Sequence, residues 1–232
     1  MKLGLSIPLY NEADLVTEVV AAIHAELLQA GIEATLVLVN NGSTDDTGSI
    51  IDELAAAEQI EAVHLRENEG YGGGILAGIA HLERAGLPEI VGWCWGDGQV
   101  SAGVLPRLVT ALRDGADLAK TVRSERCDGP ARLLITTAYA AIMRLAGLRD
   151  GDVNGCPKLM TRAAFEAIQP SSTDWFLDAE TVIKAERMGL KIAQESVIMR
   201  ARDAGRSKVR LRTLGEFALN IGRWKLGRTL QP

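Results

Sequence analysis

Asp97 is the residue whose type and setting most directly suggest chemistry. It follows the apolar run Ile90–Trp95, which is typical of a buried parallel strand, and it stands between Gly96 and Gly98. Small neighbours let a ligand approach the backbone closely, and ligands of open α/β sheets bind beyond the carboxyl ends of the strands. A turn aspartate in a Gly-Asp-Gly loop explains the same residues. This segment alone leaves the two interpretations equal.

A polar segment also follows the first strand-like run, Leu3–Ile7. Pro8 is expected to end this strand, which places Tyr10 and Asn11 at the carboxyl edge of the sheet. An aromatic ring beside an amide can stack on a nucleotide base and hydrogen-bond to it. A plain strand-to-helix connection with Asn11 as the helix cap is the alternative.

Asn40 ends the second strand-like run, Ala34–Val39, and a turn rich in asparagine, glycine and serine follows it. Asp45 and Asp46 come next, where a helix is expected to begin. Carboxylates are favoured near the positive end of a helix dipole, so both aspartates are interpreted as structural. Asn40 is therefore the better candidate for a ligand contact.

A glycine-rich segment precedes a helix and contains Gly72-x-Gly74-x-x-Ala77. This spacing matches a dinucleotide-binding fingerprint. That fingerprint belongs to the first strand-to-helix turn, however, and here it follows the third strand, which disfavours a nicotinamide enzyme. Backbone amides at this helix start could still hold an anion.

Asp178 and Glu180 lie two residues apart at the start of a predicted helix. Side chains at that spacing point in different directions, so the two carboxylates do not form one acid pair. One is expected to face the site while the other interacts with the helix dipole, and Asp178 is favoured as the functional residue.

A cationic segment occupies residues 200–208, with four basic side chains around Gly205. The whole chain carries a net charge of −5, so this clustering indicates an anionic ligand. A solvated surface loop is the alternative.

Length and composition fit one α/β domain. The chain has 232 residues, 47% of them hydrophobic, and its net negative charge argues against a nucleic-acid partner. Three widely spaced cysteines match no zinc or redox motif, which suggests free thiols in a reducing cytosol. The apolar run Leu3–Leu9 is too short for a signal peptide, and no run approaches a membrane span, so a cytoplasmic location is expected.

Strand and helix patterns alternate along the first part of the chain, which predicts a parallel sheet with helices on both faces. The expected strands are Leu3–Ile7, Ala34–Val39, Ala62–Leu65, Ile90–Trp95, Leu118–Thr121, Cys156–Thr161 and Lys191–Met199. The expected helices are Ala13–Leu28, Asp45–Ala57, Gly74–Arg84, Val104–Arg113, Arg132–Leu145 and Asp178–Met188.

In this order the segments resemble a family-2 glycosyltransferase of the GT-A fold, and most closely the polyprenyl-phosphate (dolichol-phosphate-mannose-synthase-like) sugar transferases. The matching segments are Ile7–Glu12, Asn40–Thr47, Asn68–Gly78, Gly96–Gln99, Gly155–Lys158, Trp175–Glu180 and Arg202–Lys208. The resemblance implies a Rossmann-like, mostly parallel sheet. It also implies a nucleotide-sugar-binding half at residues 1–121, an acceptor-binding half of the same domain at 122–212, and an appended helix at 213–232.

The resemblance further implies an inverting transfer of a sugar from a nucleotide-diphosphate sugar to a polyprenyl phosphate. Nucleotide-sugar binding is carried over to Pro8, Tyr10, Asn11, Glu12, Asn40, Gly70, Gly72, Asp97 and Gln99. Asp97 and Gln99 would hold Mg²⁺ or Mn²⁺ at the diphosphate, and Asp97, Asp178 and Glu180 are the catalytic candidates. Acceptor and phosphate contacts are carried over to Arg123, Arg202, Arg206, Ser207 and Lys208.

Two departures from the family pattern stand at the implied site. Trp95 replaces an acidic residue of the usual Asp-x-Asp, and Asn40 and Asn41 replace one or two aspartates. A single carboxylate plus substrate phosphates is still a common way to bind Mg²⁺. Trp95 either takes the place of a spare metal ligand or packs against part of the donor.

Three alternatives stand beside transfer to a lipid phosphate. A soluble hydroxyl acceptor would need a base, for which Asp178 is the candidate. A catalytically weak scaffold that binds a nucleotide sugar is favoured by Trp95. A sugar nucleotidyltransferase would need a glycine- and arginine-rich amino-terminal loop, which Leu3–Glu12 does not provide.

The carboxyl-terminal segment has an apolar stripe at helical spacing, with basic residues beside it. Its members are Leu211, Leu214, Phe217, Ala218, Ile221 and Trp224. Such a helix can lie in a membrane interface, which predicts a peripheral position on the inner membrane face. Packing on the protein's own core, or on a second subunit in a homodimer, explains the stripe equally well.

Overall fold

A computed structural model describes residues 1–56, 60–126 and 152–199 of the chain. A seven-stranded sheet with the strand order β3-β2-β1-β4-β6-β5-β7 forms its centre. The strands are β1 (Leu3–Leu9), β2 (Ala34–Asn41), β3 (Ile60–Leu65), β4 (Ile90–Trp93), β5 (Leu118–Arg126), β6 (Lys158–Thr161) and β7 (Ile192–Met199). The helices are α1 (Val16–Gln29), α2 (Thr47–Ala55), α3 (Gly70–Arg84), the short η1 (Ala102–Val104), α4 (Leu105–Arg113), α6 (Arg162–Ile168) and α7 (Leu177–Arg187).

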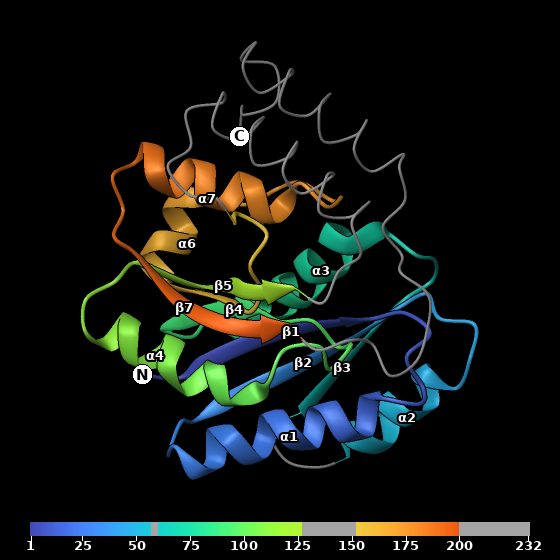
Figure 1. Cartoon of the computed structure of the whole chain (residues 1–232). Helices are drawn as coiled ribbons and strands as arrows, with labels where there is room; N and C mark the ends of the chain where they lie inside the picture. The colour runs from blue at the N-terminus through green and yellow to red at the C-terminus, as the bar shows by residue number, and fades with distance from the viewer. Residues whose placement is uncertain (57–59, 127–151, 200–232) are drawn as a thin grey trace.

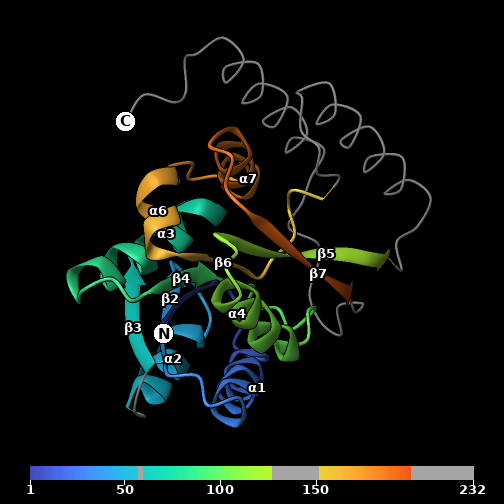
Figure 2. The same ribbon diagram turned by 90° about the vertical axis from the view of Figure 1, so that its left-hand side faces the viewer.

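Most neighbouring strands run parallel, as expected. β6 alone among the described strands runs antiparallel to its neighbours β4 and β5. Figures 1 and 2 show α1, α2 and α4 on one face of the sheet and α3, α6 and α7 on the other. The prediction of an α/β fold with a mostly parallel sheet and helices on both faces is confirmed.

The two faces of β1 differ in side-chain size, and this sets the distance to each helix layer. Leu3, Leu5 and Ile7 are fully buried in the core on the α1 side. The opposite face packs against α3, where a Cβ on Gly78 would lie 2.2 Å from the Ser6 hydroxyl oxygen. Only a glycine lets this helix approach the strand so closely, so part of the glycine content of α3 is a packing requirement.

Pro8 does not end β1, contrary to the prediction. The strand stays paired with β2 through Leu9, whereas its pairing with β4 ends at Ser6. Cys94 donates its backbone N–H to the Ser6 carbonyl. The backbone N–H and C=O groups of the even-numbered residues of β1 therefore point toward β4. The missing N–H of Pro8 therefore points beyond the end of β4, where it breaks no ladder bond.

Several element boundaries differ from the prediction. α3 begins at Gly70 instead of Gly74, and β4 ends at Trp93, two residues early. α6 was not predicted at all; it begins at once after β6, with the Thr161 hydroxyl capping it through the Ala164 N–H. The helix predicted over 132–145, the basic segment and the carboxyl-terminal stripe lie outside the described residues.

The start of α3 packs on the segment that connects α6 to α7. Gly73 donates its N–H to the Thr173 carbonyl at 2.9 Å. A Cβ on Gly72 would lie only 2.1 Å from the Ser172 carbonyl oxygen. Gly72 thus has a steric role at this contact, which joins the first part of the chain to α7.

Gly72→Ala is expected to destabilise the protein by about 1–3 kcal/mol, because the added methyl group must displace backbone. Urea unfolding followed by circular dichroism measures the loss. Gly103→Ala is the matched control, since its Cβ would meet nothing closer than the Glu26 carboxylate at 3.5 Å. Equal stability of the two variants would contradict the packing argument.

Candidate active site

The carboxyl ends of β1, β2 and β4 meet at one edge of the sheet, and the Asp97 loop leaves from it. Leu9 lies opposite Asn40 in the β1–β2 ladder. A Cβ on Gly96 would lie 2.3 Å from the Leu9 side chain, so the loop passes directly over the end of β1. The sequence-predicted nucleotide and metal residues therefore gather at this edge.

Asp97 is half-buried, and its Oδ1 accepts the Gln99 backbone N–H at 3.2 Å. Gly98 has φ +66°, a conformation that favours glycine. This bond fits the turn interpretation of Asp97. It does not exclude ligand binding, because a carboxylate has two oxygens with about four acceptor positions. The metal and diphosphate role of Asp97 and Gln99 stays a prediction.

The loops after β1 and β2 are joined by hydrogen bonds from one to the other. Asn11 donates its N–H to the Ser43 hydroxyl, and its side-chain oxygen accepts the Thr44 N–H at 2.8 Å. The Glu12 N–H donates to the Thr47 hydroxyl at 2.9 Å. Asn11 adopts φ 52° to make these contacts. The two joined loops thus form one wall of the expected base pocket.

Asn11 is not a helix cap. α1 begins only at Val16, and the residue before it makes no side-chain capping bond. Tyr10 and Glu12 are half-buried beside the joined loops, in the region where the resemblance places the base and ribose. Their contacts with a nucleotide, and that of Pro8, stay predictions.

Asp45 supports these loops, as the structural interpretation predicted. Its carboxylate accepts the Thr47 N–H at 3.0 Å, the Thr47 hydroxyl at 2.5 Å and the Ala13 N–H at 3.3 Å. Burial raises the pKa of Asp45, but the hydrogen bonds from Thr47 and Ala13 outweigh burial and hold its pKa below the ordinary value.

Asn40 and Asn41 have different partners at the end of β2. The Asn40 side chain accepts the Ser43 N–H at 3.0 Å and hydrogen-bonds His64 at 3.2 Å. Asn41 is buried; it donates to the Gly70 carbonyl at 2.8 Å and accepts the Glu69 N–H at 3.0 Å. An aspartate could not donate to that carbonyl, which accounts physically for asparagine at position 41.

Two backbone amides near the start of α3 are already bonded. Gly70 donates to the Asn68 side chain and Gly73 to the Thr173 carbonyl, both at 2.9 Å. These two groups are not directed at an anion in this structure. Gly70 and Gly72 remain predicted contacts of the nucleotide sugar.

Asp178 is the centre of a buried hydrogen-bond network, and its partners were not predicted from the sequence. Its carboxylate accepts hydrogen bonds from Lys158 Nζ at 2.6 Å, Trp93 Nε1 at 3.0 Å and the Tyr71 hydroxyl at 2.9 Å. Lys158 is fully buried and also donates to the Val153 carbonyl. The carboxylate therefore links α7 to β6, β4 and α3.

The buried surroundings of Asp178 keep a nearby tyrosine hydroxyl and two cysteine thiols protonated. Burial, and then the negative charge of Asp178, raise the pKa of the Tyr71 hydroxyl well above its ordinary value. The same two causes raise the pKa of Cys156, and burial raises that of Cys94 to about 12. Both cysteines are free and buried. Neither thiol supplies a nucleophilic thiolate near neutral pH.

Trp95 joins this network from the Asp97 loop. Its indole N–H donates to the Tyr71 hydroxyl at 2.9 Å, and Tyr71 in turn donates to Asp178. The Tyr71 ring stacks on Trp175, with centroids 4.4 Å apart and planes 7° from parallel. At the position of the usual metal-site acid, this chain thus has a neutral donor directed toward another side chain.

Glu180 points away from Asp178, so the predicted divergence of the two carboxylates is confirmed. It accepts the backbone N–H groups of Ser171 and Ser172 and forms an ion pair with Lys184 at 2.7 Å. These bonds fix the segment before α7 that packs on α3. Burial raises the pKa of Glu180, but the bonds from Lys184 and Ser172 outweigh it and hold the pKa below its ordinary value.

Arg123 forms an ion pair with Asp152 through its guanidinium and also donates its backbone N–H to that carboxylate at 3.0 Å. The buried Lys120 donates to the Asp152 carbonyl at 2.8 Å. The phosphate contact of Arg123 stays a prediction. Arg202, Arg206, Ser207 and Lys208, the other predicted phosphate contacts, lie outside the described residues.

The donors at the Asp97 loop suit a hard divalent cation. Asp97 offers a carboxylate and Gln99 an amide oxygen, both ligands that Mg²⁺ accepts. Among residues 1–56, 60–126 and 152–199, no three histidine, cysteine, aspartate or glutamate side chains are grouped to hold a metal. The residues therefore fit a cation whose remaining ligands come from a diphosphate and water.

Asp178→Asn should lower the free energy of unfolding by about 3–5 kcal/mol, because Lys158 would be left as a buried unpaired charge. Adding Lys158→Met removes that charge and should recover much of the loss. Urea unfolding of the two proteins measures the difference. If the double variant is as unstable as the single one, the ion pair does not explain the cost.

Glu180 should make stability depend on pH. Because its folded pKa is lowered, its contribution is complete above the ordinary glutamate pKa of about 4.3 and disappears as pH falls through the folded value. Glu180→Gln should therefore cost stability near neutral pH and little under more acidic conditions, as measured by unfolding at each pH. A cost that does not change with pH would argue against the charge.

Comparisons with known proteins agree on one family. Residues 5–168 match the model of glycosyl transferase family 2. An undecaprenyl-phosphate 4-deoxy-4-formamido-L-arabinose transferase of Klebsiella pneumoniae subsp. pneumoniae is 32% identical over 164 residues. That match covers 70% of this chain but 48% of the relative, so this chain spans about half its length. Polyprenol monophosphomannose synthase of Mycolicibacterium smegmatis is 27% identical over 94% of this chain and 84% of its own.

Solved structures support the fold. Glucosyl-3-phosphoglycerate synthase of Mycobacterium tuberculosis, in complex with Mn²⁺ and UDP-glucose, aligns with a TM-score of 0.69 at 21% identity. The alignment covers 100% of this chain and 80% of that one. At this identity the likeness establishes the arrangement of the chain and nothing about its ligand. With the family model matching more than half of its residues, this chain belongs to glycosyl transferase family 2.

Proposed function

We propose that this chain is an inverting glycosyltransferase that moves a sugar from a nucleotide-diphosphate sugar to a polyprenyl phosphate. The observation that carries the proposal is the position of the Asp97 loop. It passes over the end of β1, beside the joined loops that follow β1 and β2. A nucleoside diphosphate bound there would contact the joined loops with its base and reach Asp97 with its phosphates.

The charge of the leaving group governs the chemistry. Breaking the bond between sugar and diphosphate leaves negative charge on the diphosphate. A bound Mg²⁺ or Mn²⁺ supplies positive charge to stabilise it. Asp97 would hold the cation and Gln99 would contact it, while the joined loops position the nucleoside. Attack from the opposite face of the sugar then inverts the anomeric centre.

The environment of the two acidic residues on α7 supports a phosphate acceptor. A hydroxyl acceptor needs a base within hydrogen-bond reach. Asp178 is 3% exposed and bonded to Lys158, Trp93 and Tyr71, and Glu180 is bonded to Ser171, Ser172 and Lys184. Neither is placed as a ready base. A phosphate acceptor is already ionised and needs only to be positioned, which makes it the better match.

The names of the curated relatives support a lipid acceptor. One is an undecaprenyl-phosphate transferase and another a polyprenol monophosphomannose synthase. Among the described helices, none has the length and apolarity needed to span a bilayer. Because these relatives are named for lipid-phosphate acceptors, we propose that the protein reaches its acceptor from the inner membrane face as a peripheral protein. The predicted amphipathic segment at 213–232 would contact the membrane or, alternatively, a second subunit.

Trp95 favours a second candidate function. A neutral indole stands where the family has an acidic residue, so the site offers one carboxylate fewer to a cation. A scaffold that binds nucleotide sugar but turns it over weakly is consistent with that loss. Detectable nucleoside diphosphate release at an enzyme-like rate separates the two functions.

Asp97→Asn is expected to leave the fold intact and to lower turnover at least about 100-fold, the scale seen when one electrostatic contact to developing charge is lost. The measurement is release of UDP or GDP from a panel of nucleotide sugars with undecaprenyl phosphate in detergent. Soluble hydroxyl acceptors in parallel reactions test the alternative acceptor class.

Asp114→Asn is the matched control for this variant. It makes the same chemical change at an exposed residue just after α4, near the amino ends of the strands and away from the Asp97 loop. It should keep wild-type turnover. Near-normal turnover in Asp97→Asn would overturn the assigned role of Asp97, and no release by the wild type with any sugar would overturn the transferase.

A further inference from the structure

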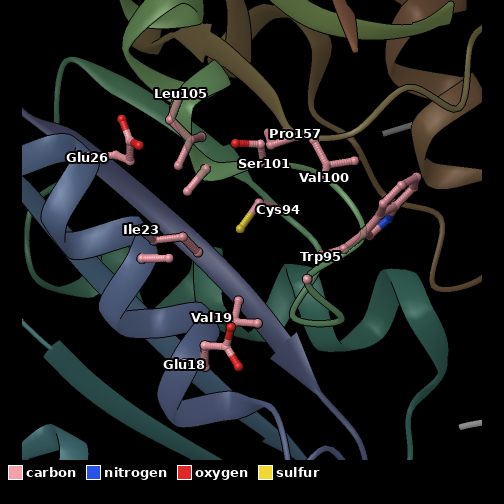
Figure 3. A pocket seen from close by; sticks show the side chains of 13 residues that line it. Glu18, Val19, Ile23, Glu26, Cys94, Trp95, Val100, Ser101, Leu105 and Pro157 are labelled. Carbon is pink, nitrogen blue, oxygen red and sulfur yellow. The ribbon is translucent and has the colours of Figure 1, made fainter. Parts of the chain in front are cut away.

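The Asp97 loop lies between helix α1 and the hydrogen-bond network of Asp178. On the side of α1 it borders a pocket of about 160 Å³, which Figure 3 shows between α1 and the loop. Val19 and Ile23 line the pocket from the helix, and Cys94, Gly98 and Val100 line it from the loop. Packing on this side is close at Gly96, where a Cβ would lie 2.3 Å from the Leu9 side chain, but the pocket leaves it incomplete.

On the other side, the loop has a directed contact. The Trp95 side chain stands two residues before Asp97; it lines the same pocket and points away from α1 (Figure 3). Its indole N–H donates to the Tyr71 hydroxyl at 2.9 Å, and the Tyr71 hydroxyl donates to Asp178 at 2.9 Å. Asp178 itself is held by Lys158 at 2.6 Å. The chain of bonds runs from the loop to a buried ion pair.

The network has a fixed polarity. The Tyr71 hydroxyl has one proton, and the Asp178 carboxylate takes it. The Tyr71 oxygen then has only acceptor capacity left, which the Trp95 N–H uses. The raised pKa of Tyr71 keeps its proton in place near neutral pH. An aspartate at position 95 could not donate to this oxygen.

From these contacts we propose that Trp95 is a positioning residue. Through Tyr71 and Asp178 it holds the Asp97 loop at the sheet edge. A loop that is held in one conformation binds the cation more tightly, and this offsets part of the metal affinity that an acidic residue would supply. The proposal rests on the assignment of Asp97 to a metal and diphosphate site. Its first test, however, uses the protein alone.

Amide hydrogen exchange followed by mass spectrometry reports the order of residues 94–100. Trp95→Phe and Tyr71→Phe each break the Trp95–Tyr71 bond. Each should speed exchange in this segment about fivefold, the net contribution of one hydrogen bond. Because both changes break the same bond, the double variant should exchange no faster than Tyr71→Phe alone.

Trp175→Phe is the matched control. It makes the same change of ring, it keeps an aromatic face against Tyr71, and it leaves the Trp95–Tyr71–Asp178 bonds intact. It should exchange like the wild type in residues 94–100. Unchanged exchange in Trp95→Phe and Tyr71→Phe would overturn the proposal, as would an equal increase in the Trp175→Phe control.

The second test separates positioning from general structure. Mn²⁺ binding is measured by electron paramagnetic resonance in the presence of UDP and, in parallel, GDP. Trp95→Phe should weaken Mn²⁺ binding about fivefold. It should leave the metal-free affinity for the nucleotide near wild type and lower the melting temperature by only the few degrees that one hydrogen bond contributes. Equal Mn²⁺ affinity in the variant and the wild type overturns the proposal. If the wild type itself binds Mn²⁺ no better with nucleotide than without, the proposed function fails. The exchange experiment still shows whether Trp95 holds the Asp97 loop through Tyr71.

Discussion

The buried Asp178 carboxylate is the interaction on which the rest of this structure depends. Moving a carboxylate out of water costs several kcal/mol, and only close partners of complementary charge and hydrogen bonding offset that cost. Lys158 provides the charge, and Trp93 and Tyr71 provide neutral donors. These partners lie on β6, β4 and α3, so the charge can be satisfied only when α7 docks correctly on the sheet. One ionic requirement therefore fixes the arrangement of four elements.

Close backbone approaches complete that arrangement. The glycines of α3 bring the helix against β1 on one side and against the Ser172 carbonyl on the other. Glu180 orders the same connecting segment through the Ser171 and Ser172 N–H groups. Two acidic residues on one helix thus hold together the elements next to the candidate site through buried hydrogen bonds. The loops after β1, β2 and β4 form the surface that we propose for the ligand.

The sequence predicts what depends on local pattern and topology. Buried apolar runs gave the strands, and the rule that ligands bind beyond strand ends pointed to Asp97 and Asn40. What it could not predict depends on distant partners: Tyr71 and Asp178 are 107 residues apart, and Trp93 and Asp178 are 85. No local pattern reports such contacts. The helix α6 was also missed, but a local signal for it was present. Thr161 is a capping residue directly before a short apolar helix.

We propose that Asp97, at the edge formed by β1, β2 and β4, binds the cation that neutralises a nucleotide diphosphate. The most direct measurement is anomalous scattering from crystals of the protein grown with Mn²⁺ and a nucleoside diphosphate. We expect a manganese peak within coordination distance of the Asp97 carboxylate, with the diphosphate on the far side of the metal and the base at the joined loops. A manganese peak elsewhere, or a nucleotide bound there without contact to Asp97, would contradict it.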